Sequence, residues 1–149
     1  NSTFQGITIE FTESISLDNN EIEKNIKFTS NSKTKKDKKI EIYNSKIKYY
    51  ENIFNKDQLK FCDELIICNS KIFYNDRSKK LKLDNLKIEN VLIQNCNMYE
   101  EIEFGKKAEI TKLIIINCVN LKKIKLLKRI FSKKKIKDIK IFNCPNLKY

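Results

Sequence analysis

A short segment with one arrangement of apolar and polar residues recurs six times along the chain. Four copies align without gaps, and the first two fit more loosely, each with a polar residue at the first apolar position. The copies begin at Thr12, Asp37, Cys62, Ile88, Ile110 and Ile136. Counted from their ninth positions, they are spaced by 25, 25, 26, 22 and 26 residues. Repeats of this length stack on their neighbours to bury a continuous core, so the repeat predicts a solenoid.

Positions 4 and 6 of every copy are apolar, as in Leu113 and Ile115. Side chains two residues apart lie on the same face of a strand, so this alternation indicates short strands with one buried face. We expect the strands to pair in parallel, in sequence order, because each copy must bury its apolar positions against its neighbours. The strands are predicted at residues 13–18, 39–43, 64–68, 90–94, 112–116 and 138–142.

Positions 8 and 9 are also distinctive. Position 8 is Asn in all six copies. Position 9 is small or polar, and it holds Asn20, Ser45, Ser70, Cys96, Cys118 and Cys144. We expect the side chain at position 9 to turn inward and bond to backbone groups, because buried polar groups are hydrogen-bonded. The three cysteines of this column are accordingly predicted to be buried and reduced.

The later copies resemble the leucine-rich-repeat family, whose pattern is L-x-x-L-x-L-x-x-N/C-x-L. The pattern is matched by Ile110, Leu113, Ile115 and Cys118, and again by Ile136, Ile139, Ile141 and Cys144. The C-x-N-L endings look like the cysteine-containing variants of the family, here rich in Ile and Asn as in an AT-rich genome. The resemblance implies an α/β solenoid. This would be a leucine-rich-repeat horseshoe with a parallel sheet of about six strands and with helices, helical turns or extended pieces on its convex side.

The Asn at position 8 favours a different solenoid, the right-handed parallel β-helix. An Asn that continued the strand beyond positions 4 and 6 would point inward, and stacked internal Asn ladders are typical of parallel β-helices. The Cys residues at position 9 favour the horseshoe instead. In residues 121–131, apolar residues fall at helical spacing with Lys between them. This stretch is predicted to be a basic amphipathic helix whose apolar stripe joins the core.

The chain has the length of one domain. We treat residues 1–149 as a single repeat domain of about six repeats of 22–26 residues. A longer array could contain this domain as a fragment. It has no His, two Gly and one Pro. The commonest general base, the commonest metal ligand and Gly-rich phosphate loops are therefore missing. The five cysteines form no C-x-x-C pair. We expect no enzyme, no metal and no cofactor.

The cysteines and the apolar runs also bear on location. Free, buried thiols favour a reducing intracellular compartment, and an isolated disulfide in a secreted protein is the alternative. The longest apolar run, Leu113 to Ile116, is much shorter than a membrane span, so we expect no transmembrane segment.

The resemblance also implies a binding surface, because positions 3, 5 and 7 of a leucine-rich solenoid face solvent on the concave sheet. Positions 5 and 7 are apolar in neighbouring copies, and contiguous exposed apolar surface commonly marks an interface. A preference of strands for Ile, or burial of both sheet faces, is the alternative explanation. We expect a non-catalytic module for protein–protein interaction, whose predicted partner-binding residues are Tyr43, Ile66, Leu92, Ile114, Ile116 and Phe142.

The end of the chain suggests a second kind of partner. Residues 122–149 hold eleven basic and one acidic side chains, most of the net charge of +12. Such a segment fits RNA, a ribosome or an acidic membrane surface, although runs of Lys are often only solvated. The anion-binding residues of this hypothesis are Lys122, Lys123, Lys128, Arg129, Lys133, Lys134 and Lys135.

Overall fold

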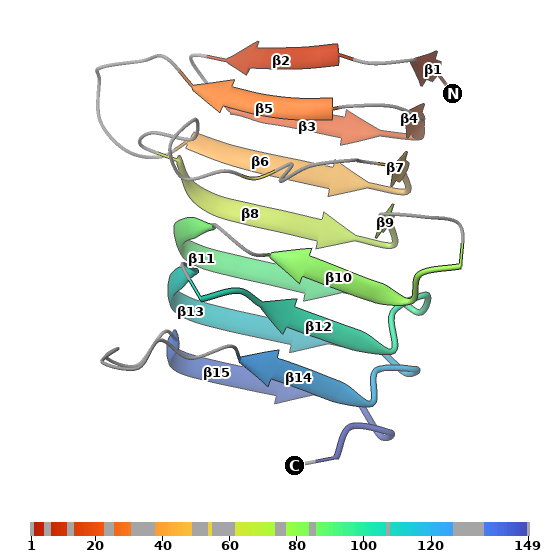
Figure 1. The fold of residues 1–149 in the computed structure, drawn as a ribbon, viewed down its shortest axis with the longest axis vertical. Helices are drawn as coiled ribbons and strands as arrows, with labels where there is room; N and C mark the ends of the chain where they lie inside the picture. Colours follow the sequence, from red (N-terminus) through yellow and green to blue (C-terminus); the bar gives the residue numbers. More distant parts are fainter. Residues whose placement is uncertain are drawn as a thin grey trace.

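The chain forms a parallel β-solenoid (Figure 1). The computed structural model describes residues 2–4, 7–11, 14–22, 26–30, 38–48, 54, 62–73, 77–83, 86–106, 108–126 and 136–148. Within these ranges every regular element is a strand. Each sequence copy contributes one strand to the largest sheet of the solenoid.

One side of the solenoid is a six-stranded parallel sheet, which we call the long sheet. It comprises β3 (Ile15–Asp18), β6 (Lys38–Tyr43), β8 (Cys62–Cys68), β11 (Lys87–Gln94), β13 (Glu109–Ile116) and β15 (Ile136–Phe142). The strands follow one another in chain order, and equivalent positions of neighbouring copies lie side by side. The predicted strands and their parallel order are confirmed.

Shorter parallel sheets form the other sides. One contains β1 (Ser2–Phe4), β4 (Asn20–Ile22), β7 (Lys46–Lys48) and β9 (Lys71–Phe73). Another contains β10 (Lys80–Leu83), β12 (Glu101–Phe104) and β14 (Lys123–Leu126). A third pairs β2 (Ile7–Phe11) with β5 (Ile26–Ser30). In Figure 1, β10, β12 and β14 run opposite to the long sheet, so each coil doubles back across the core.

The α/β horseshoe expected from the leucine-rich-repeat resemblance was wrong, and the parallel β-helix given as its alternative fits. Residues 123–126, inside the predicted amphipathic helix, form β14, and residues 127–131 lie outside the described ranges. The apolar residues of β14 also alternate with lysines at a period of two. Ile124 pairs with Ile102 of β12, so hydrogen bonding to the preceding coil decides in favour of a strand.

The core is built from stacked columns of apolar side chains. Positions 4 and 6 of the four middle coils are almost completely buried, at Ile40, Ile42, Leu65, Ile67, Val91, Ile93, Leu113 and Ile115. Burying one such side chain contributes roughly 1.5–3 kcal/mol. The equivalent Ile139 of the last strand is 40% exposed, because no described coil follows it.

The Asn at position 8 ends each strand of the long sheet. All six have positive φ, between 47° and 60°, which Asn tolerates better than other residues that carry a Cβ. The backbone N–H of Asn69 donates to the carbonyl of Gln94 in the next coil at 2.9 Å, and Asn95 donates to Ile116 at 3.0 Å. The side chains lie towards solvent, where Asn69 Nδ2 donates to Asn44 Oδ1 at 2.7 Å. The expected inward direction of this Asn was wrong, because the left-handed turn rotates it outward.

The side chains at position 9 turn inward instead, as predicted. Ser70 Oγ donates to the carbonyl of Cys68 at 2.8 Å, and Cys96 Sγ makes the same contact with Gln94 at 3.3 Å. The backbone N–H of Ser45 in turn donates to Ser70 Oγ at 3.0 Å. None of the five cysteines forms a disulfide. Cys96 and Cys118 are buried, whereas Cys144, in the last coil, is only half-buried.

We predict that Asn95→Ala lowers the free energy of unfolding by about 1–2 kcal/mol, because a Cβ disfavours the left-handed region and Ala lacks the tolerance of Asn. Asn95→Gly should cost less, because Gly adopts this φ without strain. Urea denaturation measures both. A Gly variant less stable than the Ala variant would contradict the backbone explanation.

We predict that Cys68 and Cys144 react with a thiol reagent in the folded protein, whereas Cys96 and Cys118 react only after unfolding. Burial raises the pKa of the Cys68 and Cys144 thiols above the ordinary value of 9.0, so their labelling should accelerate only in alkaline solution. A hydrogen bond with the Cys118 thiol and burial raise the pKa of Cys96 as well. Mass spectrometry of labelled peptides over a pH series gives the order in which the four thiols react.

Candidate interaction surface

The outer face of the long sheet carries positions 3, 5 and 7 of each copy. In-register pairing aligns equivalent positions into rows that cross the strands. Across the last five strands, the middle row, at position 5, contains Glu41, Ile66, Leu92, Ile114 and Lys140. The two charged residues therefore lie at the ends of this five-strand row, and three apolar side chains lie between them.

Two further rows flank the middle row across the same five strands. The turn-side row, at position 7, contains Tyr43, Cys68, Gln94, Ile116 and Phe142. The polar row, at position 3, contains Lys39, Glu64, Asn90, Lys112 and Asp138. Apolar and aromatic side chains are thus bordered on one side by charges, as in many protein interfaces.

The structure brings the six predicted partner-binding residues onto this one face. Five of them are half-buried, while Phe142 is 53% exposed. Their partial burial comes from neighbours in the same sheet, and no described segment covers the face. The face is an outer side of a β-solenoid, not the concave surface of a horseshoe.

Polar side chains on the face contact one another. Partial burial and the nearby Glu41 carboxylate, which hydrogen-bonds the Tyr43 side chain, raise the pKa of Tyr43. Cys68 Sγ lies 3.9 Å from Gln94 Oε1, and Lys39 Nζ lies 3.6 Å from Glu64 Oε2. These contacts join Tyr43 to Glu41 on one strand and link neighbouring strands at Cys68 and Lys39.

The predicted anion-binding set is described only in part. Lys122 and Lys123 are exposed, and Lys122 Nζ lies 3.2 Å from Glu100 Oε1. The remaining members, Lys128, Arg129, Lys133, Lys134 and Lys135, lie outside the described residues.

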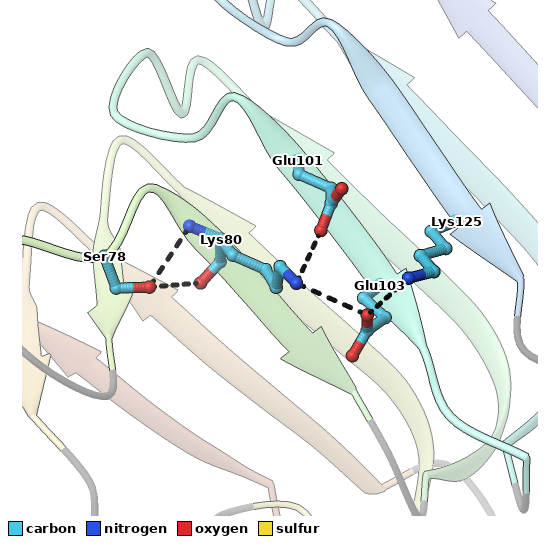
Figure 2. A network of polar contacts seen from close by, with 5 residues as sticks. All are labelled: Ser78, Lys80, Glu101, Glu103 and Lys125. Carbon is cyan, nitrogen blue, oxygen red and sulfur yellow. Dashed lines mark hydrogen bonds and ion pairs between the residues drawn. The ribbon is translucent and has the colours of Figure 1, made fainter.

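A charged array on β10, β12 and β14 was missed by sequence reasoning (Figure 2). Lys80 Nζ lies 2.8 Å from Glu101 Oε2 and 3.4 Å from Glu103 Oε1. Lys125 Nζ approaches the same Glu103 oxygen at 3.8 Å. A hydrogen bond to Glu101 is the largest cause of a raised pKa at Lys80. Three successive coils are therefore joined by charges of alternating sign.

The signal for this array was present in the sequence. Lys80 pairs in register with Glu101, which pairs with Lys123; Lys82, Glu103 and Lys125 repeat the same order. Glu103 is only 6% exposed, so its two lysine neighbours compensate a buried carboxylate. We interpret these ion pairs as contacts that keep the three coils in register.

Comparisons with known proteins identify no relative of this chain. The chain matches no protein-family model, no curated protein and no solved structure. Among the described residues, no group of three or more His, Cys, Asp or Glu side chains could hold a metal ion. No helix long and apolar enough to cross a membrane occurs in the same residues.

We predict that Glu103→Gln lowers the free energy of unfolding by about 1–2 kcal/mol, because Gln keeps the side-chain volume but loses the charged contacts with Lys80 and Lys125. The control is Glu109→Gln, which breaks an exposed pair with Lys87 at 3.8 Å and should cost less than about 0.5 kcal/mol. Urea denaturation of both variants provides the comparison. Equal losses would argue against a special role for the array.

Proposed function

We propose that this chain is a non-catalytic interaction module that binds a protein partner through the outer face of the long sheet. The observation that carries the proposal is the unbroken run of Ile66, Leu92 and Ile114 across three neighbouring strands on a solvent-facing side. Ile116 and Phe142 extend this apolar surface in the adjacent row.

A comparison between two sides of the same solenoid supports the proposal. The outward positions of β10, β12 and β14 are all Lys or Glu. The outer face of the long sheet also carries charges, but its middle row places Ile66, Leu92 and Ile114 side by side at outward positions. Because both sides are parallel strands of the same chain, strand propensity and composition alone do not account for this difference. Selection for a binding surface explains the difference.

The energetics of the face suit a protein partner. Covering roughly 40 Å² of remaining apolar surface on an Ile or Leu contributes about 1 kcal/mol. Several such side chains at the centre, with charges at the edge, give both affinity and orientation. The free cysteines support a reducing, intracellular location for the complex.

We predict that a photo-reactive benzophenone residue placed at position 92 forms a protein adduct in cells that make this protein. The same residue at position 82, exposed on β10, is the control and should form little adduct. Adding Ile114→Lys should remove the adduct at position 92, because a charge then enters the apolar row. Gel mobility and mass spectrometry identify the protein that is cross-linked to the chain.

Equal adducts at both positions, or adducts of RNA alone, would contradict the proposal. The ionic strength of the extract provides a second criterion. A contact made by the Lys-rich end should weaken steeply between about 50 and 200 mM salt, whereas a contact made by the outer face, with its apolar centre and mixed charges, should weaken much less.

A further inference from the structure

The outer face of the last five strands of the long sheet, β6 to β15, is complementary to itself when the order of these five strands is reversed. The sixth strand, β3, lies beyond the matched part of the face. Sheets pack face to face about 10 Å apart with their strands nearly aligned. A two-fold axis that lies in such an interface, parallel to the strands and level with β11, keeps each row opposite the same row of a second copy. It places the coil of β6 opposite that of β15, the coil of β8 opposite that of β13, and β11 opposite itself.

The middle row then forms a complete set of favourable pairs. Glu41 of one copy faces Lys140 of the other, and Ile66 faces Ile114. Leu92 lies on the axis and meets its own equivalent. Two opposite-charge pairs therefore flank six apolar side chains, three from each copy.

The turn-side row behaves in the same way. Tyr43 faces Phe142, which pairs two aromatic rings. Cys68 faces Ile116, and Gln94 meets Gln94, whose amide can donate to and accept from its equivalent.

The polar row completes the match. Lys39 faces Asp138, Glu64 faces Lys112, and Asn90 meets Asn90. The existing pair between Lys39 and Glu64, at 3.6 Å, is retained and becomes part of a longer chain of alternating charges. All three independent charge pairs across the three rows join opposite signs.

The other two-fold arrangement lacks this complementarity. An axis along the stacking direction would place Glu41 opposite Glu41 and Lys140 opposite Lys140. Like charges brought together at an interface cost affinity. The sequence of the face therefore distinguishes between the two symmetric ways of pairing it.

We infer that the partner of this face is a second copy of the chain, bound as an isologous dimer with Leu92 on the two-fold axis. The inference rests on the proposed function and specifies its partner. Each pair off the axis occurs twice, as a two-fold interface requires.

The size of the face sets the expected strength. Five strands about 4.8 Å apart and five residues about 3.3 Å apart give a footprint of roughly 24 by 16 Å in each copy. The two copies together therefore cover roughly 800 Å², less than the about 1,200–2,000 Å² of stable specific complexes. We expect a weak, reversible dimer that forms at high micromolar concentrations.

Sedimentation equilibrium over about 1–500 µM protein tests the inference. The wild type should dimerise, and Leu92→Arg should be monomeric because two cations would meet on the axis. Glu41→Lys and Lys140→Glu should each weaken dimerisation at least tenfold. An equimolar mixture of these two variants should recover dimerisation, because the mixed pair has opposite charges at both contacts. Lys106→Glu, in the exposed turn after β12, is the control, and circular dichroism confirms folding.

Failure of the mixture to recover dimerisation, or a dimer insensitive to Leu92→Arg, would overturn the inference. So would a wild type that remains monomeric throughout. The adduct at position 92 then separates the two proposals. An adduct with a different protein keeps the proposed function and removes only the second copy, whereas no protein adduct removes both.

Discussion

Parallel hydrogen bonding between successive coils is the interaction on which the rest of the structure depends. Each inner strand of the long sheet pairs with the coils before and after it, and the Asn at position 8 continues this pattern through the turn. The register is fixed by the apolar columns, because a slip of one residue would carry buried side chains such as Leu65 and Ile67 to the outside. The core, the turns and the outer face therefore share a single register.

Stacking in register imposes a chemical rule on every column, because each side chain meets its equivalents about 4.8 Å away. Apolar columns satisfy the rule directly. A buried polar column must provide its own partners, and the position 9 column does so through contacts such as Ser45 N–H to Ser70 Oγ. A charged column is stabilised where its signs alternate, as in Lys80, Glu101 and Lys123. A row of Ile and Leu on a solvent-facing side satisfies the stacking rule but leaves apolar surface for a partner.

The period-two alternation predicted the strands of the long sheet and their order, because it is reinforced by the spacing of six copies. The other sides were not predictable in the same way. A run of four residues such as Lys123–Leu126 fits both a helix and a strand, and only pairing with β12 decides.

The positive φ of the Asn residues turns their side chains outward, a change that residue spacing does not reveal. The ion pairs of Glu101 and Glu103 were not predicted, because their lysine partners lie in other coils and are distant in the sequence. The alternation also predicted that the six proposed partner-binding residues share one outer face, because side chains two residues apart lie on the same side of a strand.

Register also explains how a flat face can select one docking position. Two copies of a stacked sheet have the same strand spacing, so they could slide past each other by one coil without losing steric fit. Moving the axis by half a coil spacing in one direction places Lys39 opposite Lys112, and moving it in the other places Glu64 opposite Asp138. Either shift also sets a charged end of the middle row, Glu41 or Lys140, against an apolar side chain. Burying an unpaired charge is costly, so the arrangement centred on Leu92 is favoured over its neighbours by charge placement and not by shape.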